Sequence, residues 1–356
     1  MLVLEPCAPR RLFNTHYMAT IYDVSVMAGV SLATVSRVMN NNTKVSDKTK
    51  KKVLDAMRML GYRPNTIAQS LASKCSNSVG VLVSQLDGPF YGPMMTEIET
   101  ALRAANKHVI IAAGHSDEKQ EKEGVEFLMS RGCDALILDV EAVSDDYLIE
   151  LSKGSTPVVF INRYIDSIKE RCVYLENEQG GFMATEHILS LGHKHLAYIS
   201  GPLFKLDVRD RLKGHKRALQ QYHIPFDETL CYEGDFRELG GHNAMEYLMS
   251  LNKPITAVVC ANDQMASGAI AVCLEHGLRV PEDISFIGYD NIPFPQYISP
   301  KLSTVSNPIN EMGKMAARWV LQQVYNNKDV VIERSFQPEL FIRDSAKAIG
   351  LKESII

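Results

Sequence analysis

The sequence lacks the features that would place the protein in a membrane or an oxidising compartment. No stretch approaches the roughly 20 apolar residues that a membrane-spanning helix requires. Its seven cysteines are odd in number, scattered, and free of any C-x-x-C pair, so neither a disulfide framework nor a zinc site is expected. Glu5, Pro6 and Pro9 interrupt the apolar start, which argues against a secretory leader. We therefore expect a cytoplasmic protein with reduced thiols.

Common catalytic and nucleotide-binding motifs are also missing. The chain has no G-x-x-x-x-G-K-[ST], no G-x-S-x-G and no H-E-x-x-H, and no G-x-G-x-x-G follows a predicted strand. The densest histidine group, His187, His193 and His195, lies where a predicted helix gives way to a strand, and packing accounts for it better than a metal does. We expect no enzyme activity, no metal and no cofactor.

Length and charge divide the chain unequally. A length of 356 residues predicts two domains, or one large domain with an appendage. With 46% hydrophobic and 22% charged residues, the composition is that of an ordinary globular protein. Residues 1–75 hold 11 Lys and Arg against 4 Asp and Glu, a net charge of +7, which leaves −11 for the remaining residues. A basic head on an acidic body suggests an anionic polymer as partner, although a merely solvated basic face is the alternative.

Local capping signals predict three helices in the basic head, at residues 21–28, 32–40 and 47–60. Thr20, Ser31 and Ser46 are suitable N-caps, and Gly29 can adopt the left-handed conformation that ends the first helix. Two short helices joined through a glycine turn form a helix-turn-helix. Four lysines, Lys48, Lys50, Lys51 and Lys52, lie at the start of the third helix. They oppose its dipole, so phosphate neutralisation explains them better than helix stability.

The segment TIYDVSVMAGVSLATVSRVMNNNTKVSDKTKKKVLDAMRMLGYRPNTIAQSLAS resembles the DNA-binding head of the lactose/galactose repressor family. The resemblance implies that the second helix enters the major groove, with Leu32, Ala33 and Arg37 facing the bases and Arg37 able to pair with a guanine. It also implies phosphate contacts from Thr20, Tyr22, Ser31, Thr34, Ser36, Asn40 and Tyr62. For Tyr22 and Ser36, packing and capping are the alternatives.

The linker after the head is expected to carry a hinge helix. Pro64 stops the third helix and Asn65 can cap a short one at residues 66–73, which is too short to be stable alone. The resemblance implies that this helix folds only when two copies pair on DNA, and that Asn65, Ala68 and Leu71 contact the DNA. Leu71 would wedge into the minor groove and kink the duplex. A flexible linker is the alternative.

The body alternates apolar β-branched runs with amphipathic stretches. The expected strands are Val79–Val83, Val109–Ala113, Ala135–Leu138, Val158–Ile161, His195–Ser200, Leu230–Tyr232, Ala257–Cys260, Ser285–Gly288 and Leu340–Ile342. Such runs predict parallel strands covered on both faces, and a break near residue 176 predicts two doubly wound lobes. The body resembles the same family in six segments: PVVFINR, GHKHLAYISGP, RLKGHKRAL, AVVCANDQMASGAI, ISFIGYDNIP and KLSTVSNP. The expected fold is therefore α/β, a two-lobed body similar to periplasmic binding proteins behind a small all-α helix-turn-helix head.

Polar and aromatic residues follow several of these strands, where ligands of doubly wound sheets bind. Carboxylate, amide and guanidinium groups suit the vicinal hydroxyls of a sugar, and aromatic rings suit its C–H faces. The expected ligand contacts are Phe90, Tyr91, Asn162, Arg163, Arg211, Phe236, Asn262 and Asp290. For Asp263 we favour a cap of the following helix, while Asp207 and Arg209 could equally form a surface ion pair.

These patterns divide the chain into five predicted segments. Residues 1–17 are a disordered tail or result from a start codon assigned too early, residues 18–63 are a helix-turn-helix domain, and residues 64–76 are a hinge and linker. Residues 77–345 are a ligand-binding and dimerisation domain, and residues 346–356 are a C-terminal tail. That tail is too short for a coiled coil, so a homodimer is expected. The resemblance implies a repressor of sugar-utilisation genes that binds pseudo-palindromic operator DNA and is released by a small sugar. Within the family, the chain looks most similar to repressors of galactose or β-glucoside genes, and the similarity lies in VSLATVSR, RCVYLEN and IGYDNIPFPQYISPKLSTV. The alternatives are a corepressor-dependent regulator of purine type, and a sugar receptor or carbohydrate-active protein with an incidental basic head.

Overall fold

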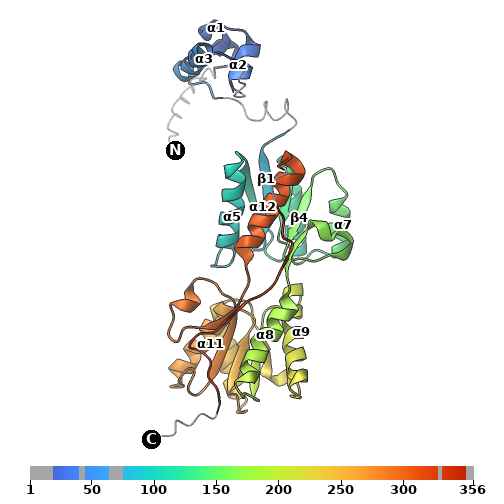
Figure 1. The fold of residues 1–356 in the computed structure, drawn as a ribbon, viewed down its shortest axis with the longest axis vertical. Helices are drawn as coiled ribbons and strands as arrows, with labels where there is room; N and C mark the ends of the chain where they lie inside the picture. Colours follow the sequence, from blue (N-terminus) through green and yellow to red (C-terminus); the bar gives the residue numbers. More distant parts are fainter. Residues whose placement is uncertain (1–18, 40–44, 64–74, 328–330, 350–356) are drawn as a thin grey trace, which may run out of the picture. The chain divides into compact units, whose positions relative to one another are not determined.

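The chain forms two compact units in this computed structural model, which describes residues 19–39, 45–63, 75–327 and 331–349. The first unit, the head, spans Met1–Ser76, and the second, the body, spans Asn77–Ile356 (Figure 1). The predicted N-terminal tail, the hinge helix and most of the C-terminal tail lie outside the described residues.

The described part of the head packs three helices around a small core: α1 (Ile21–Ala28), α2 (Leu32–Met39) and α3 (Asp47–Leu60). One fully buried valine comes from each helix, namely Val24, Val35 and Val53. Thr20 and Asp23 form a capping box at the start of α1, and Gly29 ends it in the left-handed region at φ +63°. The predicted bounds of α1 and α3 are confirmed. The prediction for α2 ended at Asn40, which lies outside the described residues.

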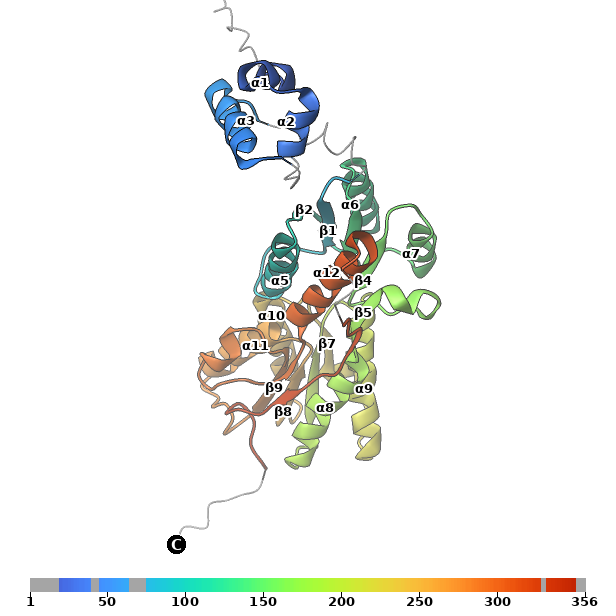
Figure 2. The same cartoon turned by 45° about the horizontal axis from the view of Figure 1, so that its top comes forward.

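The first lobe of the body is built on a parallel sheet with strand order β11-β5-β4-β3-β1-β2. Its strands are β1 (Ser78–Val83), β2 (His108–Ala113), β3 (Ala135–Leu138), β4 (Val158–Ile161), β5 (Cys172–Leu175) and β11 (Ser335–Phe336). Its helices are α5 (Tyr91–Ala104), α6 (Glu118–Ser130), α7 (Asp145–Ser152) and α12 (Ile309–Tyr325). Alternate residues of one strand enter different cores: Val81 packs with α5 and α12, whereas Leu82 packs with α6. Helices therefore cover both faces, and α5 and α12 lie side by side (Figure 2).

The second lobe has the same design, with strand order β12-β10-β9-β8-β6-β7. Its strands are β6 (Leu196–Ser200), β7 (Cys231–Glu233), β8 (Ala257–Cys260), β9 (Ser285–Asp290), β10 (Ser303–Ser306) and β12 (Leu340–Phe341). Its helices are α8 (Asn177–Ser190), α9 (Leu206–Gln221), α10 (Glu238–Ser250) and α11 (Asp263–Glu275). They pack in pairs, α8 on α9 and α10 on α11. Because helices join the parallel strands, the carboxyl ends of those strands gather at one edge of each sheet.

The body differs from the prediction in four respects. The chain passes from β5 into α8 near residue 176, as expected, but it also returns through α12 and β11 to the first lobe and ends in the second lobe with β12. Strands β5, β10 and β11 were not predicted. It was also wrong to expect parallel strands throughout, since β12 pairs antiparallel with β10. Finally, β9 continues to Asp290, so Asp290 is its last residue rather than a loop residue beyond it.

Among the described residues, no single helix combines the length and apolar character needed to span a bilayer. By those two criteria alone, α1 and α2 qualify together as a bent pair.

Candidate functional site

The turn before α2 and the packing of its buried side fix the orientation of this helix. The chain bends by 105° between α1 and α2, a helix-turn-helix angle, and the Val30 N–H donates to the Ser25 carbonyl within the turn. At the start of α2, the Thr34 N–H donates to Ser31 Oγ at 3.2 Å. Because Val35 and Val38 are buried against the core, the rotation of α2 is fixed. Its opposite side is then presented to solvent.

The predicted DNA contacts fall into three groups by exposure. Those exposed are Thr20, Tyr22, Ser31, Ala33, Ser36 and Arg37. Those half-buried are Leu32, Thr34 and Tyr62. Asn40, Asn65, Ala68 and Leu71 lie outside the described residues. On α2, the exposed group brings an arginine, a hydroxyl and a methyl to one accessible surface, and this chemistry suits a base edge and a phosphate.

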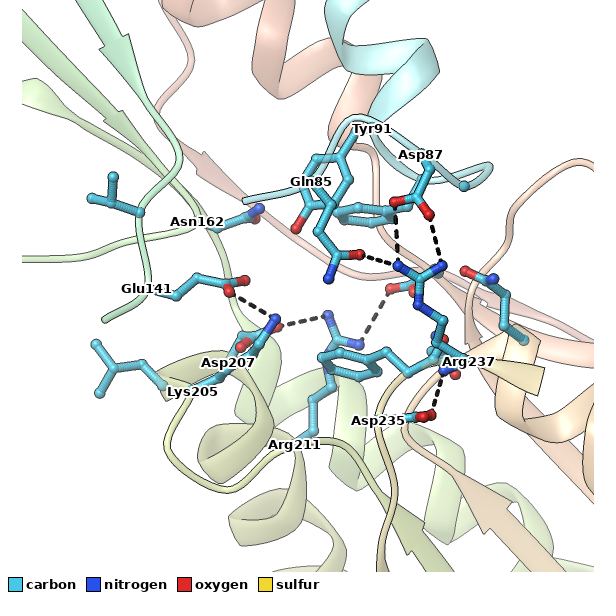
Figure 3. A pocket seen from close by; sticks show the side chains of 18 of the residues that line it. Gln85, Asp87, Tyr91, Glu141, Asn162, Lys205, Asp207, Arg211, Asp235 and Arg237 are labelled. Carbon is cyan, nitrogen blue, oxygen red and sulfur yellow. Dashed lines mark hydrogen bonds and ion pairs between the residues drawn. The ribbon is translucent and has the colours of Figure 1, made fainter. Parts of the chain in front are cut away.

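A cleft in the body lies between the two lobes and encloses about 880 Å³, part of it open to solvent. The first lobe contributes Gln85, Asp87, Gly88, Phe90, Tyr91, Val140, Glu141, Asn162 and Arg163. The second lobe contributes Lys205, Leu206, Asp207, Arg211, Asp235, Phe236, Arg237, Asn262, Gln264 and Asp290. All eight residues predicted to contact the ligand are present in these walls. Figure 3 shows side chains from both lobes converging on the cleft, with Tyr91, Asn162 and Arg211 among them.

Arg211 is the most deeply buried charge of the cleft, with 2% of its surface exposed. Its guanidinium donates to Asn177 Oδ1 at 2.9 Å, to the Ala261 carbonyl at 2.7 Å and to Asp290 Oδ1 at 3.2 Å. It also stacks on the Tyr289 ring, 3.9 Å from the ring centroid. Burial alone would lower its pKa, but its acidic neighbours, led by Asp290, together outweigh burial, and the pKa of Arg211 lies above its ordinary value. The guanidinium therefore stays charged.

Two glycines position Arg211 by letting α8 and α9 approach closely. A Cβ on Gly181 would lie 2.0 Å from the Arg211 carbonyl oxygen, and one on Gly214 would lie 2.0 Å from the Glu178 carbonyl oxygen. Any other residue at either position would push the two helices apart. The short helix-to-helix distance brings Asn177 of α8 within reach of the Arg211 side chain.

Several cleft residues adopt backbone conformations that are rare for residues with a side chain. Asn162, Phe236 and Asp290 have φ values of +56°, +69° and +96°. Positive φ is uncommon outside glycine, and strained residues of this kind gather at functional sites. At Phe236, glycine again makes room, since a Cβ on Gly201 would lie 2.5 Å from the Phe236 ring. These conformations turn the three side chains toward the cleft.

Two of the predicted contacts, Asn162 and Arg163, also have structural partners. Asn162 donates to Asp139 Oδ1 at 3.2 Å, and burial, followed by the nearby Glu141, raises the pKa of Asp139 well above its usual range. Arg163 donates to Asp145 Oδ1 at 2.9 and 2.6 Å and to the Val143 carbonyl, so its guanidinium is tied to the start of α7.

Asn262 uses both ends of its amide. Its Oδ1 accepts from the Met265 N–H at 2.9 Å and its Nδ2 donates to the Phe236 carbonyl at 2.8 Å. Asn262 is thus the cap of α11, and the expectation that Asp263 is that cap was wrong. Asp263 is instead buried at the first helical position, where its carboxylate accepts from the Ile292 N–H and from Thr304 Oγ1. It thereby anchors the loop that follows Asp290.

For Asp207 and Arg209, the surface ion pair was one of two open alternatives, and the structure contradicts it. Asp207 faces Arg211, with 3.5 Å between Oδ2 and the guanidinium. Arg209 instead donates to the carbonyls of Leu203 and Phe204. Asp207 therefore joins the charged cluster of the cleft, because both it and Asp290 face the same arginine.

Two contacts that cross the cleft were not foreseen. Arg237 at the start of α10 donates to Asp87 at 2.9 Å and to Gln85 at 2.9 Å, both in the loop after β1 (Figure 3). The hydrogen bond from Arg237 lowers the pKa of Asp87. Lys205 pairs with Glu141 at 2.7 Å on the other side (Figure 3). Each pair joins residues far apart in sequence, and no local pattern signals it.

In the predicted histidine group, His193 has hydrogen-bond partners, whereas the buried His187 Nε2 has none among the described residues. His193 contacts Thr256 Oγ1 at 3.0 Å and the Lys347 carbonyl at 2.9 Å, and burial lowers its pKa. Within the described ranges, no group of three or more His, Cys, Asp or Glu side chains is placed to hold a metal ion.

Comparison with known proteins identifies the family. Residues 20–65 match the bacterial regulatory proteins of the lacI family, and residues 185–346 match the periplasmic binding protein-like domain. The regulator GalR of Escherichia coli K12 is 36% identical over 337 residues, which cover 95% of this chain and 98% of GalR. The chain belongs to the LacI family.

Family members with different names are similar to this LacI-family chain to a comparable extent. The repressor PurR of Aliivibrio fischeri MJ11 is 34% identical over 92% of this chain and 98% of PurR. A crystal structure of the Lac repressor dimer bound to operator and the anti-inducer ONPF superposes with a TM-score of 0.82 at 30% identity, covering 93% of this chain and 100% of that one. This LacI-family chain is therefore a DNA-binding transcription regulator with a helix-turn-helix head and a periplasmic-binding-protein-like body.

Proposed function

We propose that this regulator is a homodimeric repressor that binds pseudo-palindromic operator DNA and is released by a small sugar bound in the cleft. The observation that carries the proposal is the buried cluster of Arg211, Asp290 and Asp207 at strand and helix ends of the second lobe, facing the walls of the first. The head supplies the DNA-binding half of this function, and the cleft supplies the regulatory half.

The chemistry of the cleft favours a polyhydroxylated ligand. Charged and amide groups from both lobes can accept from and donate to adjacent hydroxyls, and a hydrogen bond to a charged group is stronger than one between neutral groups. Phe236 on one side and the edge-to-face pair Phe90 and Tyr91 on the other supply apolar surface for the C–H faces of a sugar ring. Phe90 and Tyr91 have ring centroids 5.1 Å apart and planes at 85°. A monosaccharide or a small glycoside of galactose or β-glucoside type fits these contacts.

The switch needs a ligand that binds one arrangement of the lobes better than another. Because the cleft walls come from both lobes, a sugar within it contacts both and changes the energy difference between their arrangements. Lys205–Glu141 and Arg237–Asp87 bias the same equilibrium, since each pair joins the lobes. A sugar that displaces or reinforces these pairs alters operator affinity through the linker.

On DNA, the proposed roles follow the exposed residues of α2. Arg37 makes hydrogen bonds to a guanine. Ala33 and Leu32 either contact a thymine methyl group or exclude bulky groups of the bases, and Ser31 and Thr34 bind phosphates. Two copies read two half-sites of one operator, as the two-fold symmetry of a dimer requires. We place the protein in the cytoplasm, with no catalytic activity, cofactor or metal.

The decisive experiment has two steps. First, a binding site is selected from random duplexes with the full-length protein. Second, fluorescence anisotropy follows release of that duplex as single monosaccharides and disaccharides are added. Sugar-driven release supports the proposal, and tightening by a purine base supports the corepressor alternative. Sugar binding without any DNA affinity would contradict the proposal and favour a receptor.

A further inference from the structure

Helix α12 spans the first lobe from the side of the second lobe to the end where β1 begins (Figure 1). Its 17 residues give a length of about 25 Å, at the rise of about 1.5 Å per residue of an α-helix. The helix packs on α5 and on the strands β3, β4 and β5. One element therefore reaches from the boundary between the lobes to the end of the first lobe at which the chain enters the body.

The start of α12 is tied to the cleft through Asn307, two residues before the helix. The Asn307 N–H donates to the Asp290 carbonyl at 3.1 Å, and the Asn307 carbonyl accepts from the Ile309 N–H at 2.7 Å. Ile309 is the first residue of α12. Asp290 in turn pairs with Arg211 through its side chain at 3.2 Å. A change in the position of Asp290 therefore displaces the residues from which α12 starts.

The middle of α12 is packed too closely to absorb such a displacement by bending. A Cβ on Gly313 would lie 2.9 Å from the Met94 carbonyl oxygen of α5, so the two helices meet almost at their backbones. The Trp319 indole N–H donates to the Glu170 carbonyl at 3.0 Å. Close-packed helices keep their shape and respond to a displaced end by a small sliding motion along their neighbours. A displacement at Ile309 consequently arrives at the last turn of the helix.

The last residue of α12 meets the first residue of the body. Tyr325 Oη donates to Asp134 Oδ2 at 2.7 Å, and the Asn77 N–H donates to the same oxygen at 2.7 Å. Lys107 joins the two a second time, because its Nζ lies 3.9 Å from the Tyr325 ring centroid and 2.5 Å from Asn77 Oδ1. Asn77 directly follows Ser76, the last residue of the head unit. The end of α12 is therefore connected to the point at which the linker enters the body.

Asn77 is held from both sides. Its carbonyl accepts from the His108 N–H at 2.8 Å, beside the first pair of the β1–β2 ladder, and its N–H is held by Asp134. Its φ of +56° lies in the left-handed region, which few residues other than glycine and asparagine adopt readily. Because the sheet fixes one side of Asn77, movement of Asp134 on the other side rotates the backbone there. The residues that precede Asn77 then leave the body in a different direction.

We propose that Tyr325, Asp134, Lys107 and Asn77 transmit the ligand state of the cleft to the linker, with α12 as the rigid connection and Tyr325 as a positioning residue. This role rests on the proposed function, because it concerns how a sugar in the cleft alters operator affinity. Tyr325 lines no wall of the cleft and belongs to the body, not to the head. It should therefore set how strongly sugar and operator binding are coupled, and leave the affinity for each one alone unchanged.

The test is the ratio of operator affinities without sugar and with saturating sugar, measured by fluorescence anisotropy on the full-length protein. The probe is the monosaccharide or disaccharide of the release experiment that frees the most wild-type protein from its selected duplex. Tyr325→Phe removes the hydroxyl group and keeps the ring beneath Lys107. We expect this ratio to move toward one by roughly two- to thirtyfold. Calorimetric sugar affinity of the free protein and operator affinity without sugar should match the wild type.

A second variant and a matched control separate coupling from a general effect on the fold. Lys107→Met removes the ammonium that joins Asn77 to Tyr325, and it should lower the ratio in the same direction. Tyr222→Phe is the control, because Tyr222 is an exposed tyrosine at the end of α9, and it should keep the wild-type ratio.

The outcomes distinguish this role of α12 from the proposed function. Wild-type ratios in both Tyr325→Phe and Lys107→Met would overturn the role of α12 alone, since the sugar would still release the operator. Loss of sugar affinity in Tyr325→Phe would also overturn it, because Tyr325 would then support the fold of the body and not the coupling. If no sugar released the wild type, the proposed function and the role of α12 would fail together.

Discussion

Lys205 and Glu141 form an ion pair across the cleft, with 2.7 Å between Nζ and Oε2, although they belong to different lobes. The pair is well shielded, since the Lys205 and Glu141 side chains are 8% and 16% exposed. Ser116 donates to the same Glu141 oxygen at 2.5 Å, which fixes the carboxylate on the side of the first lobe. The two lobes therefore hold each other through a contact that depends on their separation.

Glu141→Gln should weaken effector binding. The amide preserves the shape of the side chain but leaves the Lys205 ammonium without its anion. The loss disfavours the lobe arrangement seen here, which we expect the sugar to bind, by about 1–3 kcal/mol. We expect a roughly ten- to hundredfold lower sugar affinity, measured by calorimetry, and a larger radius of gyration in small-angle scattering. Glu150→Gln is the control, because its pair with Lys153 is exposed on the surface of α7. An unchanged affinity would show that the pair plays no part in ligand binding.

Arg37→Ala should lower operator affinity by about 1–3 kcal/mol and relax the choice of one base pair per half-site. The exposed guanidinium is the one group of the predicted base-facing set that can make two hydrogen bonds to guanine. Anisotropy with the selected operator and its single-base variants measures both effects. Arg279→Ala, which removes an exposed arginine of the body, should have no effect. Equal losses on unrelated duplexes would make Arg37 a phosphate contact.

Glu121→Gln should destabilise the body by about 1–3 kcal/mol. The buried Glu121 carboxylate accepts from the backbone N–H groups of Glu141, Ala142 and Val143 at 2.8 to 3.1 Å. An amide turns a donor toward this row of donors, so at least one N–H loses its partner. Urea unfolding measures the change, and the exposed Glu118→Gln of the same helix is the control. Wild-type stability of Glu121→Gln would show that water replaces these bonds.

Stability should fall on acidification because of His215. Burial, assisted by the charge of Lys216, lowers its pKa to about 3 in the folded protein, against about 6.5 when unfolded, so the unfolded chain binds more protons between these values. The free energy of unfolding should therefore drop by roughly 2 kcal/mol from this group between pH 7 and pH 5. His215→Phe should remove that part of the pH dependence in urea titrations. An identical slope in both proteins would mean that His215 is protonated without loss of the fold.

The head was predictable because its signals are local. Thr20, Gly29 and Ser46 each cap a helix through contacts with residues at most four positions away. The bounds of α1 and α3 could therefore be predicted from the local sequence. The long strands of the body were found for a similar reason, since their apolar runs are continuous. By contrast, β10 reads Ser-Thr-Val-Ser, and its buried hydroxyl groups are satisfied only in the folded chain. Thr304 donates to Asp263 and Ser303 accepts from the Arg343 N–H.

The cleft was predictable in part. Residues at the carboxyl ends of strands, such as Arg163 and Asp290, were placed in its walls by sheet topology and by family resemblance. The contacts between the lobes could not be predicted, because Arg237 and Asp87 are 150 positions apart and meet only through the fold of the whole body. Asp263 was misassigned for a related reason, as its partners Ile292 and Thr304 are distant in sequence.

The central claim is that a ligand in this cleft controls DNA binding, and Asp290→Asn tests it most directly. Asparagine tolerates the positive φ at this position and its carbonyl can still accept from Arg211, so folding and operator binding should stay near wild type. One carboxylate oxygen becomes a donor, however, and a pair of sugar hydroxyls loses its partner at a cost of about 1–3 kcal/mol. Operator release should therefore need roughly ten- to hundredfold more sugar than in the wild type. Coincident release curves for the two proteins would contradict the account and make Asp290 a purely structural residue.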